Sequence, residues 1–131
     1  MNKQSLLYLF GIAALAGCTT LPGFSEGQTG NGYDSYFVTN VGRLAGHAEA
    51  IASICPSLSF SAAELEMRHV AICQGQGLED NCALPGLTSE KDSAFAETVA
   101  NLSATDPAEV CADTRADAQA DPSLAAFLNG I

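Results

Sequence analysis

Apolar residues between positions 34 and 55 recur at alternating steps of four and three. This spacing places them on one stripe of a helix, which we expect to run from about Asp34 to Ile54. Pro56 disfavours helical geometry in the residue before it, so the helix should end there. The stripe consists of Phe37, Val41, Leu44, Ala48, Ile51 and Cys55.

A second helix is predicted by a capping signal. Ser61 and Glu64 have the capping-box spacing, in which Ser61 accepts from the amide three residues on and Glu64 reaches back to the Ser61 amide. This helix should run from Ala62 to about Cys73, before glycines stop it. Its inward face is expected to carry Leu65, His69, Val70 and Cys73.

Three later polar residues mark further helix starts. Ser89 can cap a third helix, Asp106-Pro107 opens a fourth and Asp121-Pro122 opens a short fifth that should stop at Gly130. No stretch alternates for long enough to predict a sheet. The pattern therefore predicts an all-α fold, a small bundle of four to five helices. The expected core residues of these last helices are Phe95, Val99, Leu102, Leu124, Phe127 and Leu128.

The amino-terminal segment has the order of a secretory signal. Lys3 lies in a short polar start, and Leu6–Leu15 is an apolar run that leads into small residues. A membrane-spanning helix needs about 20 apolar residues, which this run does not supply. We therefore expect residues 1–17 to be a cleaved signal peptide.

The residues at the end of that signal, Leu15-Ala16-Gly17-Cys18, resemble the lipobox of bacterial lipoproteins. The resemblance implies that a diacylglyceryl group joins the Cys18 thiol, that the signal is removed and that the new amino terminus is acylated. Thr19 differs from the aspartate that retains lipoproteins in the inner membrane of enterobacteria. The expected location is therefore the periplasmic face of a bacterial membrane, the outer membrane rather than the inner.

Residues 19–32 are rich in glycine and poor in apolar side chains, which is typical of a flexible tether. Fourteen such residues reach roughly 20 Å on average and about 46 Å at full stretch. The predicted organisation is thus a signal peptide at 1–17, a lipidated cysteine with its tether at 18–32, and one helical domain at 33–131.

Charge narrows the choice of partners. After residue 17 the chain has four cationic residues against fifteen acidic ones, a formal net charge of −11. This acidity excludes nucleic acid as a natural partner and should hold the domain off anionic lipid head groups. It also serves solubility.

The five cysteines fit this location. Lipidation uses Cys18 and leaves an even set of four, which can pair in three ways. If consecutive helices pack antiparallel, Cys55 and Cys73 lie at opposite ends of the second helix, about 17 Å apart, whereas a disulfide needs Cα atoms within about 7 Å. We therefore pair Cys55 with Cys111 and Cys73 with Cys82.

Candidate chemistry is sparse. His69 and Cys73 are four apart on one helix face with Cys82 nearby, a spacing that zinc ligands use, but an oxidised compartment favours a disulfide and we expect no metal. His47 and Glu49 are two apart and so lie on different sides of their helix. No phosphate-binding loop, dinucleotide fingerprint or haem-attachment motif occurs, so no cofactor is expected beyond the lipid on Cys18.

These observations predict a tethered, non-catalytic binding, assembly or accessory module of the cell envelope, such as a pilotin-like escort, with an envelope protein as its partner. The alternative is a cell-wall-associated enzyme, or an inhibitor of a basic enzyme such as lysozyme, which the negative charge would attract.

Overall fold

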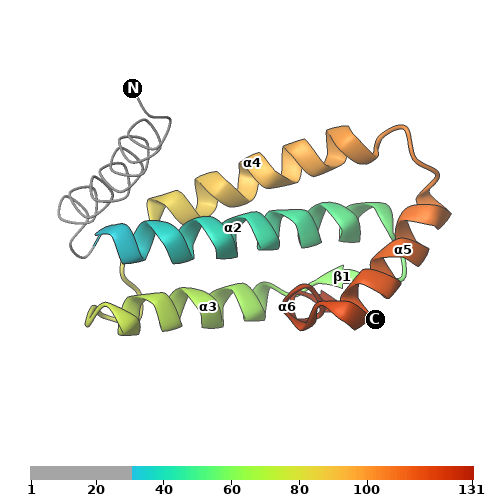
Figure 1. The fold of residues 1–131 in the computed structure, drawn as a ribbon. Coiled ribbons are helices and arrows are strands. Elements are labelled where there is room, and N and C mark those ends of the chain that lie inside the picture. Colours follow the sequence, from blue (N-terminus) through green and yellow to red (C-terminus); the bar gives the residue numbers. More distant parts are fainter. Residues whose placement is uncertain (1–30) are drawn as a thin grey trace, which may run out of the picture. The chain divides into compact units, whose positions relative to one another are not determined.

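The computed structural model describes residues 31–131, and residues 34–131 form one compact unit. This part of the chain contains five helices and one short strand pair, and Figure 1 shows how the helices are arranged. In chain order the elements are α2 (Asn31–Ile54), β1 (Ser59–Phe60), α3 (Ala62–Gly75), α4 (Pro85–Leu102), α5 (Pro107–Ala120), α6 (Pro122–Ala126) and β2 (Leu128–Asn129). The predicted small, disulfide-stapled helical bundle is confirmed.

The predicted signal peptide, Cys18 and the tether as far as Gly30 lie outside the described residues. Helix α2 begins at Asn31, three residues before the predicted start, and ends at Ile54 as predicted. Within residues 31–131, none of the helices combines the length and apolar character that crossing a bilayer requires.

Helix α2 is the central element, and α4 packs against it at very short range. A Cβ atom added at Gly42 would lie 2.7 Å from the Glu90 Cβ, and one added at Gly46 would meet the Lys91 carbonyl oxygen. Both glycines are buried, one helical turn apart on the same face. The missing side chains therefore let the two backbones approach closely at these positions, and Figure 1 shows α4 diverging from α2 toward its carboxyl-terminal end.

The main core lies on the other side of α2, against α3 and the carboxyl-terminal segment. Of the predicted stripe, four members are buried, Leu44 is half-buried and Phe37 is 36 % exposed. Phe127 is fully buried, and its ring stacks on Phe60 with centroids 6.1 Å apart. The buried residues of this core are Val38, Val41, Ala45, Ala48, Ile72, Cys73, Leu84, Leu87, Leu124, Phe127 and Leu128.

A smaller core closes the end of α2 where that helix finishes. Helix α5 contributes Val110, which packs with Ile51, Cys55 and Leu58. The Cys55–Cys111 disulfide joins the same two segments, with Cα atoms 5.6 Å apart. Helix α5 is therefore fixed, by packing and by a covalent bond, to the carboxyl-terminal end of α2.

The chain end differs from the predicted fifth helix. Helix α6 stops at Ala126, and Leu128 then pairs with Phe60 in an antiparallel ladder of two residues on each strand. Gly130 follows with a φ of +97°, and a Cβ there would meet the Ser57 carbonyl oxygen. The predicted continuation to Gly130 is wrong because pairing with β1 satisfies this backbone in place of a further helical turn.

Helix α3 begins as predicted, but only half of the capping box forms. The Ser61 hydroxyl accepts from the Glu64 amide at 3.2 Å. The Ser61 amide donates to the Phe127 carbonyl at 2.8 Å. The Glu64 carboxylate instead accepts from Arg68 at 2.7 Å. Docking of the chain end has thus replaced the second half of the box.

The predicted start of the third helix is wrong. Helix α4 begins at Pro85, one turn before Ser89, and Leu84 precedes it without a side-chain cap. Proline suits the first helical position because its φ is fixed and its missing amide hydrogen would have no partner there. The predicted inward face is also displaced, since Phe95 and Leu102 are half-buried and Val99 is 36 % exposed. The buried residues of α4 are Leu87, Ala94 and Thr98.

The starts of α5 and α6 match the prediction. Asp106 accepts from the Ala108 amide at 2.8 Å, and Asp121 accepts from the Ser123 amide at 2.9 Å. A proline occupies the first turn of each helix. Aspartate followed by proline is therefore the local signal that sets both helix starts.

Candidate functional site

The Cys73–Cys82 disulfide ties the end of α3 to the loop that leads into α4. Its Cα atoms are 5.8 Å apart. The same loop is held by a 2.9 Å bond from the Leu78 amide to the Cys73 carbonyl and by a 3.0 Å bond from Gln74 to Asp80. These two hydrogen bonds do not use the sulfurs, so they support the loop independently of the disulfide.

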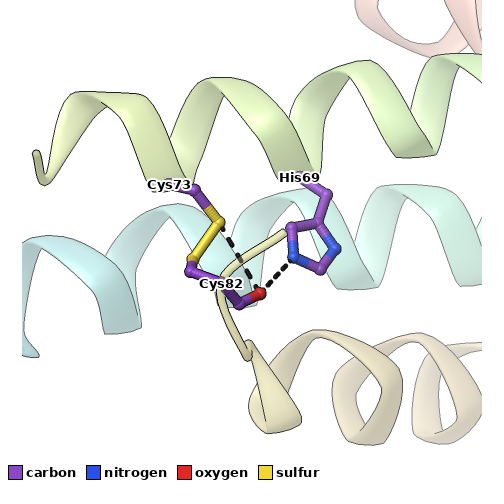
Figure 2. A group of neighbouring side chains, drawn as sticks. All are labelled: His69, Cys73 and Cys82. Carbon is purple, nitrogen blue, oxygen red and sulfur yellow. Dashed lines mark hydrogen bonds between the residues drawn. A yellow bond between two sulfur atoms is a disulfide. The ribbon is translucent and has the colours of Figure 1, made fainter. Parts of the chain in front are cut away.

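His69 lies one helical turn before Cys73 and faces the same loop (Figure 2). Its Nε2 is 2.6 Å from the Cys82 carbonyl oxygen. Because a carbonyl only accepts, Nε2 carries the hydrogen in this state. The Cys73 sulfur is 3.7 Å from the same oxygen, but a disulfide sulfur has no hydrogen to donate, so this is a contact only.

The structure therefore brings together the three residues that the sequence singled out as a conceivable zinc set. One ligand atom from each of His69, Cys73 and Cys82 lies within 4.8 Å of the other two. Cys73 is fully buried, whereas Cys82 and His69 are half-buried. Both sulfurs are bonded to each other, so neither is a thiolate that could bind a metal in this state.

The four cysteines that were predicted to pair do so in the predicted combination, Cys55 with Cys111 and Cys73 with Cys82. Cys18, the predicted lipid anchor, lies outside the described residues. The two disulfides lie at opposite ends of α2. Cys55 follows the last residue of α2, whereas the Cys73–Cys82 loop leads to α4 beside the start of α2 (Figure 1).

A cleft of about 390 Å³ lies between α2 and α4 and is lined largely by polar side chains. His47 Nδ1 is 3.2 Å from the Thr98 hydroxyl across this cleft. Thr98 is only 8 % exposed, so its hydroxyl is covered rather than presented to a substrate. The lining residues are Arg43, Leu44, His47, Ala94, Glu97, Thr98 and Asn101.

The environment of His47 favours the neutral imidazole. Desolvation by the packed helices lowers the pKa of His47 below 6.5, and the negative charge of Asp117 opposes this effect. Glu49, two residues on, instead accepts a 2.7 Å bond from Lys91. His47 and Glu49 thus have separate hydrogen-bond partners, but both partners belong to α4, so the predicted placement of the pair on different sides of the helix is not confirmed.

The outer side of α5 carries carboxylates at steps of four residues. Glu109, Asp113 and Asp117 are all exposed, and the exposed capping residues Asp106 and Asp121 extend the series at both ends. Residues four apart lie on one side of a helix. We call Glu109, Asp113 and Asp117 the acidic face of α5.

The cationic residues of the described chain leave this face unneutralised. Arg43 and Lys91 form ion pairs with carboxylates of other helices, and Arg68 and Lys91 also pair with a carboxylate of their own helix. Arg115, the cationic residue of α5, donates to the Ser57 hydroxyl at 2.6 Å. Within residues 31–131, fourteen acidic residues stand against these four. No ion pair among the described residues includes a member of the acidic face.

Acidity was predicted for the chain as a whole and not for this face of α5. The signal was present, because Glu109, Asp113 and Asp117 follow a predicted helix start at the spacing of one helix face. Only the structure shows that Arg115 points to another segment.

Comparison with known proteins adds no family. No family model matches the chain, and no curated protein sequence or solved structure is significantly similar to it.

Proposed function

We propose that this chain is a lipid-anchored protein on the periplasmic face of the bacterial outer membrane that binds a basic surface of an envelope protein, without catalysing a reaction. The lipobox-like Leu15-Ala16-Gly17-Cys18 supports the anchor. The observation that carries the binding role is the exposed, unneutralised acidic face of α5.

The position of α5 supports a role in contact with a partner away from the tether. Helix α2 has 24 residues, and the predicted tether joins it at its first turn. A helix of that length spans about 36 Å. The Cys55–Cys111 bond holds α5 at the far end of α2. The acidic face therefore lies about the length of α2 away from the residues that the predicted tether joins, which leaves it accessible to a partner.

The charge of this face defines the chemistry of the partner. Carboxylates in a row attract arginine and lysine side chains, which speeds association and sets orientation more than it adds affinity. Contacts of this kind weaken as salt increases, because exposed charges are screened within about 8 Å at physiological ionic strength. The partner should therefore carry a basic patch, and its binding should depend steeply on ionic strength.

The binding proposal is tested by photo-crosslinking in the native host. A photoreactive residue replaces exposed Ala116 beside the acidic face in one variant and exposed Ala71 of α3 in a control. The crosslinked partner is identified by mass spectrometry, purified, and its affinity measured at several salt concentrations. We expect a partner specific to the Ala116 position.

Two variants that lose the same number of charges distinguish binding through the acidic face from a general effect of the chain's negative charge. Asp113→Asn/Asp117→Asn removes two charges from the face, and Glu66→Gln/Glu79→Gln removes two from other exposed positions. At about 0.2–1 kcal/mol for each exposed ion pair, the first variant should weaken binding about 2- to 30-fold. Equal weakening by both variants, or none by either, would refute the proposal.

An inhibitor of a basic enzyme is a second candidate, because the same face would also attract such an enzyme. Lysozyme is a suitable probe. Stoichiometric inhibition of its cell-wall hydrolysis by the wild-type chain, lost in Asp113→Asn/Asp117→Asn, would favour inhibition over a purely structural partner.

The anchor has its own test. Cys18→Ser removes the residue to which lipid is expected to attach, so labelling by a radioactive fatty acid should be lost and the protein should leave the membrane fraction. Retention of both in the variant would show that Cys18 is not the anchor.

A further inference from the structure

We infer that reduction of the Cys73–Cys82 bond converts the His69, Cys73 and Cys82 cluster into a site for a thiophilic metal ion of the zinc(II) or copper(I) kind. This goes beyond the proposed binding role, and it rests on the side chains drawn in Figure 2. An imidazole and two thiolates form a donor set that these ions prefer.

The geometry of the three residues is close to that of a bound metal. One donor atom from each already lies within 4.8 Å of the others. Zinc bonds of about 2.3 Å to sulfur and about 2.0 Å to nitrogen place tetrahedral ligands roughly 3.5–3.8 Å apart. His69 and Cys73 lie four apart on α3, so a metal needs only side-chain rotation in these two residues.

The backbone supports the same conclusion for Cys82. Its Cα atom is 5.8 Å from that of Cys73, and the hydrogen bonds of Leu78 and Gln74 hold the loop without the sulfurs. The second bridge, Cys55–Cys111, lies at the other end of α2 and still closes the fold. The cluster can therefore stay assembled when its disulfide is reduced.

The chemistry needs a dithiol reductant, which the cell envelope would have to supply. Its thiolate attacks the sulfur of half-buried Cys82 rather than that of fully buried Cys73, and a mixed disulfide forms. The second thiol of the reductant then displaces Cys82, so the reductant leaves as a disulfide and the protein gains two thiols. A zinc ion replaces the two thiol protons.

His69 supplies the third bond through Nε2, the nitrogen that faces Cys82. That atom now donates to the Cys82 carbonyl, so the hydrogen must move to Nδ1 in the other neutral tautomer. Three protein ligands leave a fourth tetrahedral position for water or for a donor from a partner. The site is therefore open to exchange rather than closed.

The test uses the full-length protein in detergent, with Zn²⁺ alone as the probe. The protein is reduced with a phosphine, which adds no competing thiols, and alkylation followed by mass spectrometry shows which cysteines are free. We expect one Zn²⁺ per reduced chain and none per oxidised chain. Cys82→Ser should abolish binding.

Histidine variants distinguish zinc binding by the cluster from zinc binding by thiols elsewhere in the chain. His69→Gln keeps a donor for the Cys82 carbonyl but removes the imidazole. Because loss of a residue that merely supports a ligand costs about 10- to 100-fold in metal affinity, loss of the ligand should cost at least as much. The matched control, His47→Gln, should leave zinc affinity unchanged.

Three results would overturn the inference. The first is no zinc binding by protein whose Cys73 and Cys82 are shown to be free, and the second is binding that His69→Gln does not weaken. The third is loss of helical circular dichroism on reduction that Zn²⁺ does not restore, because the cluster would then not survive without its disulfide.

Discussion

Replacing both cysteines of the Cys55–Cys111 bond with alanine should destabilise the domain more than the same change in Cys73–Cys82. The two pairs are matched in burial, because each contains one fully buried and one half-buried cysteine. They differ in the chain they close, since the first spans 56 positions and the second spans 9. The comparison therefore isolates the effect of loop length.

The chain-entropy relation gives the expected size of the difference. A closed loop of the longer span removes about 4.2 kcal/mol of unfolded-state entropy at 25 °C, and one of the shorter span about 2.6 kcal/mol. Cavity losses are similar in both variants and largely cancel, which leaves about 1.6 kcal/mol between them. A domain of this size has about 5–15 kcal/mol in total, so the first variant should lose a large share of it.

Urea unfolding followed by circular dichroism under non-reducing conditions measures both variants. Equal slopes with different midpoints would show that the change lies in stability rather than in the size of the transition. Limited proteolysis should rank the variants in the same order. Equal losses, or a larger loss in Cys73→Ala/Cys82→Ala, would refute the loop-entropy reasoning.

Three further predictions concern packing, capping and titration. Gly46→Ala should lower the free energy of unfolding by about 2 kcal/mol, because overpacking against the α4 backbone costs up to about 3 kcal/mol and helix propensity returns about 1; an unchanged urea midpoint would mean that the helices separate freely. Asp106→Ala should lower the free energy of unfolding by about 1 kcal/mol, because the hydrogen bond from the Ala108 amide to the Asp106 carboxylate is lost. Urea unfolding measures this change as well. NMR titration should place the pKa of His47 below 6.5, and lower still in Asp117→Asn. The pKa of His47 is lower in the folded protein than in the unfolded chain, so the folded state favours the neutral imidazole. The contribution of His47 to stability is therefore fully present above pH 6.5 and is lost as the pH falls from 6.5 toward the folded pKa. His47→Gln should remove this part of the pH dependence of stability.

The order and lengths of the helices were enough to predict the cysteine pairing. Antiparallel helices and their lengths place Cys55 near Cys111 and Cys73 near Cys82, and the structure joins these pairs. The predicted pairs form because the ends of rigid helices fix where short loops must lie. The His69 cluster follows from the same reasoning, since residues four apart share a face and the Cys82 loop returns to it.

Side-chain environment was less predictable than helix position. The Ser89 cap fails because Pro85 already begins α4 one turn earlier. The expected inward residues Phe95 and Val99 turn partly outward because the contact with α2 is made through Gly42 and Gly46, where only small residues such as Ala94 fit. A pattern of apolar residues does not show where glycine permits a closer and less apolar contact.

The sequence by itself determined the helical class, the positions of most helices and the cysteine pairs, because each depends on local chemistry or on simple distances along a helix. Only the tertiary structure decided three other features. The carboxyl-terminal strand forms because Leu128 pairs with Phe60 of β1. The close contact of α2 with α4 forms because two glycines meet another helix. The acidic face of α5 remains unneutralised because Arg115 bonds to Ser57, 58 positions away along the chain. Each of these depends on a residue distant in sequence, and local patterning carries no information about such a partner.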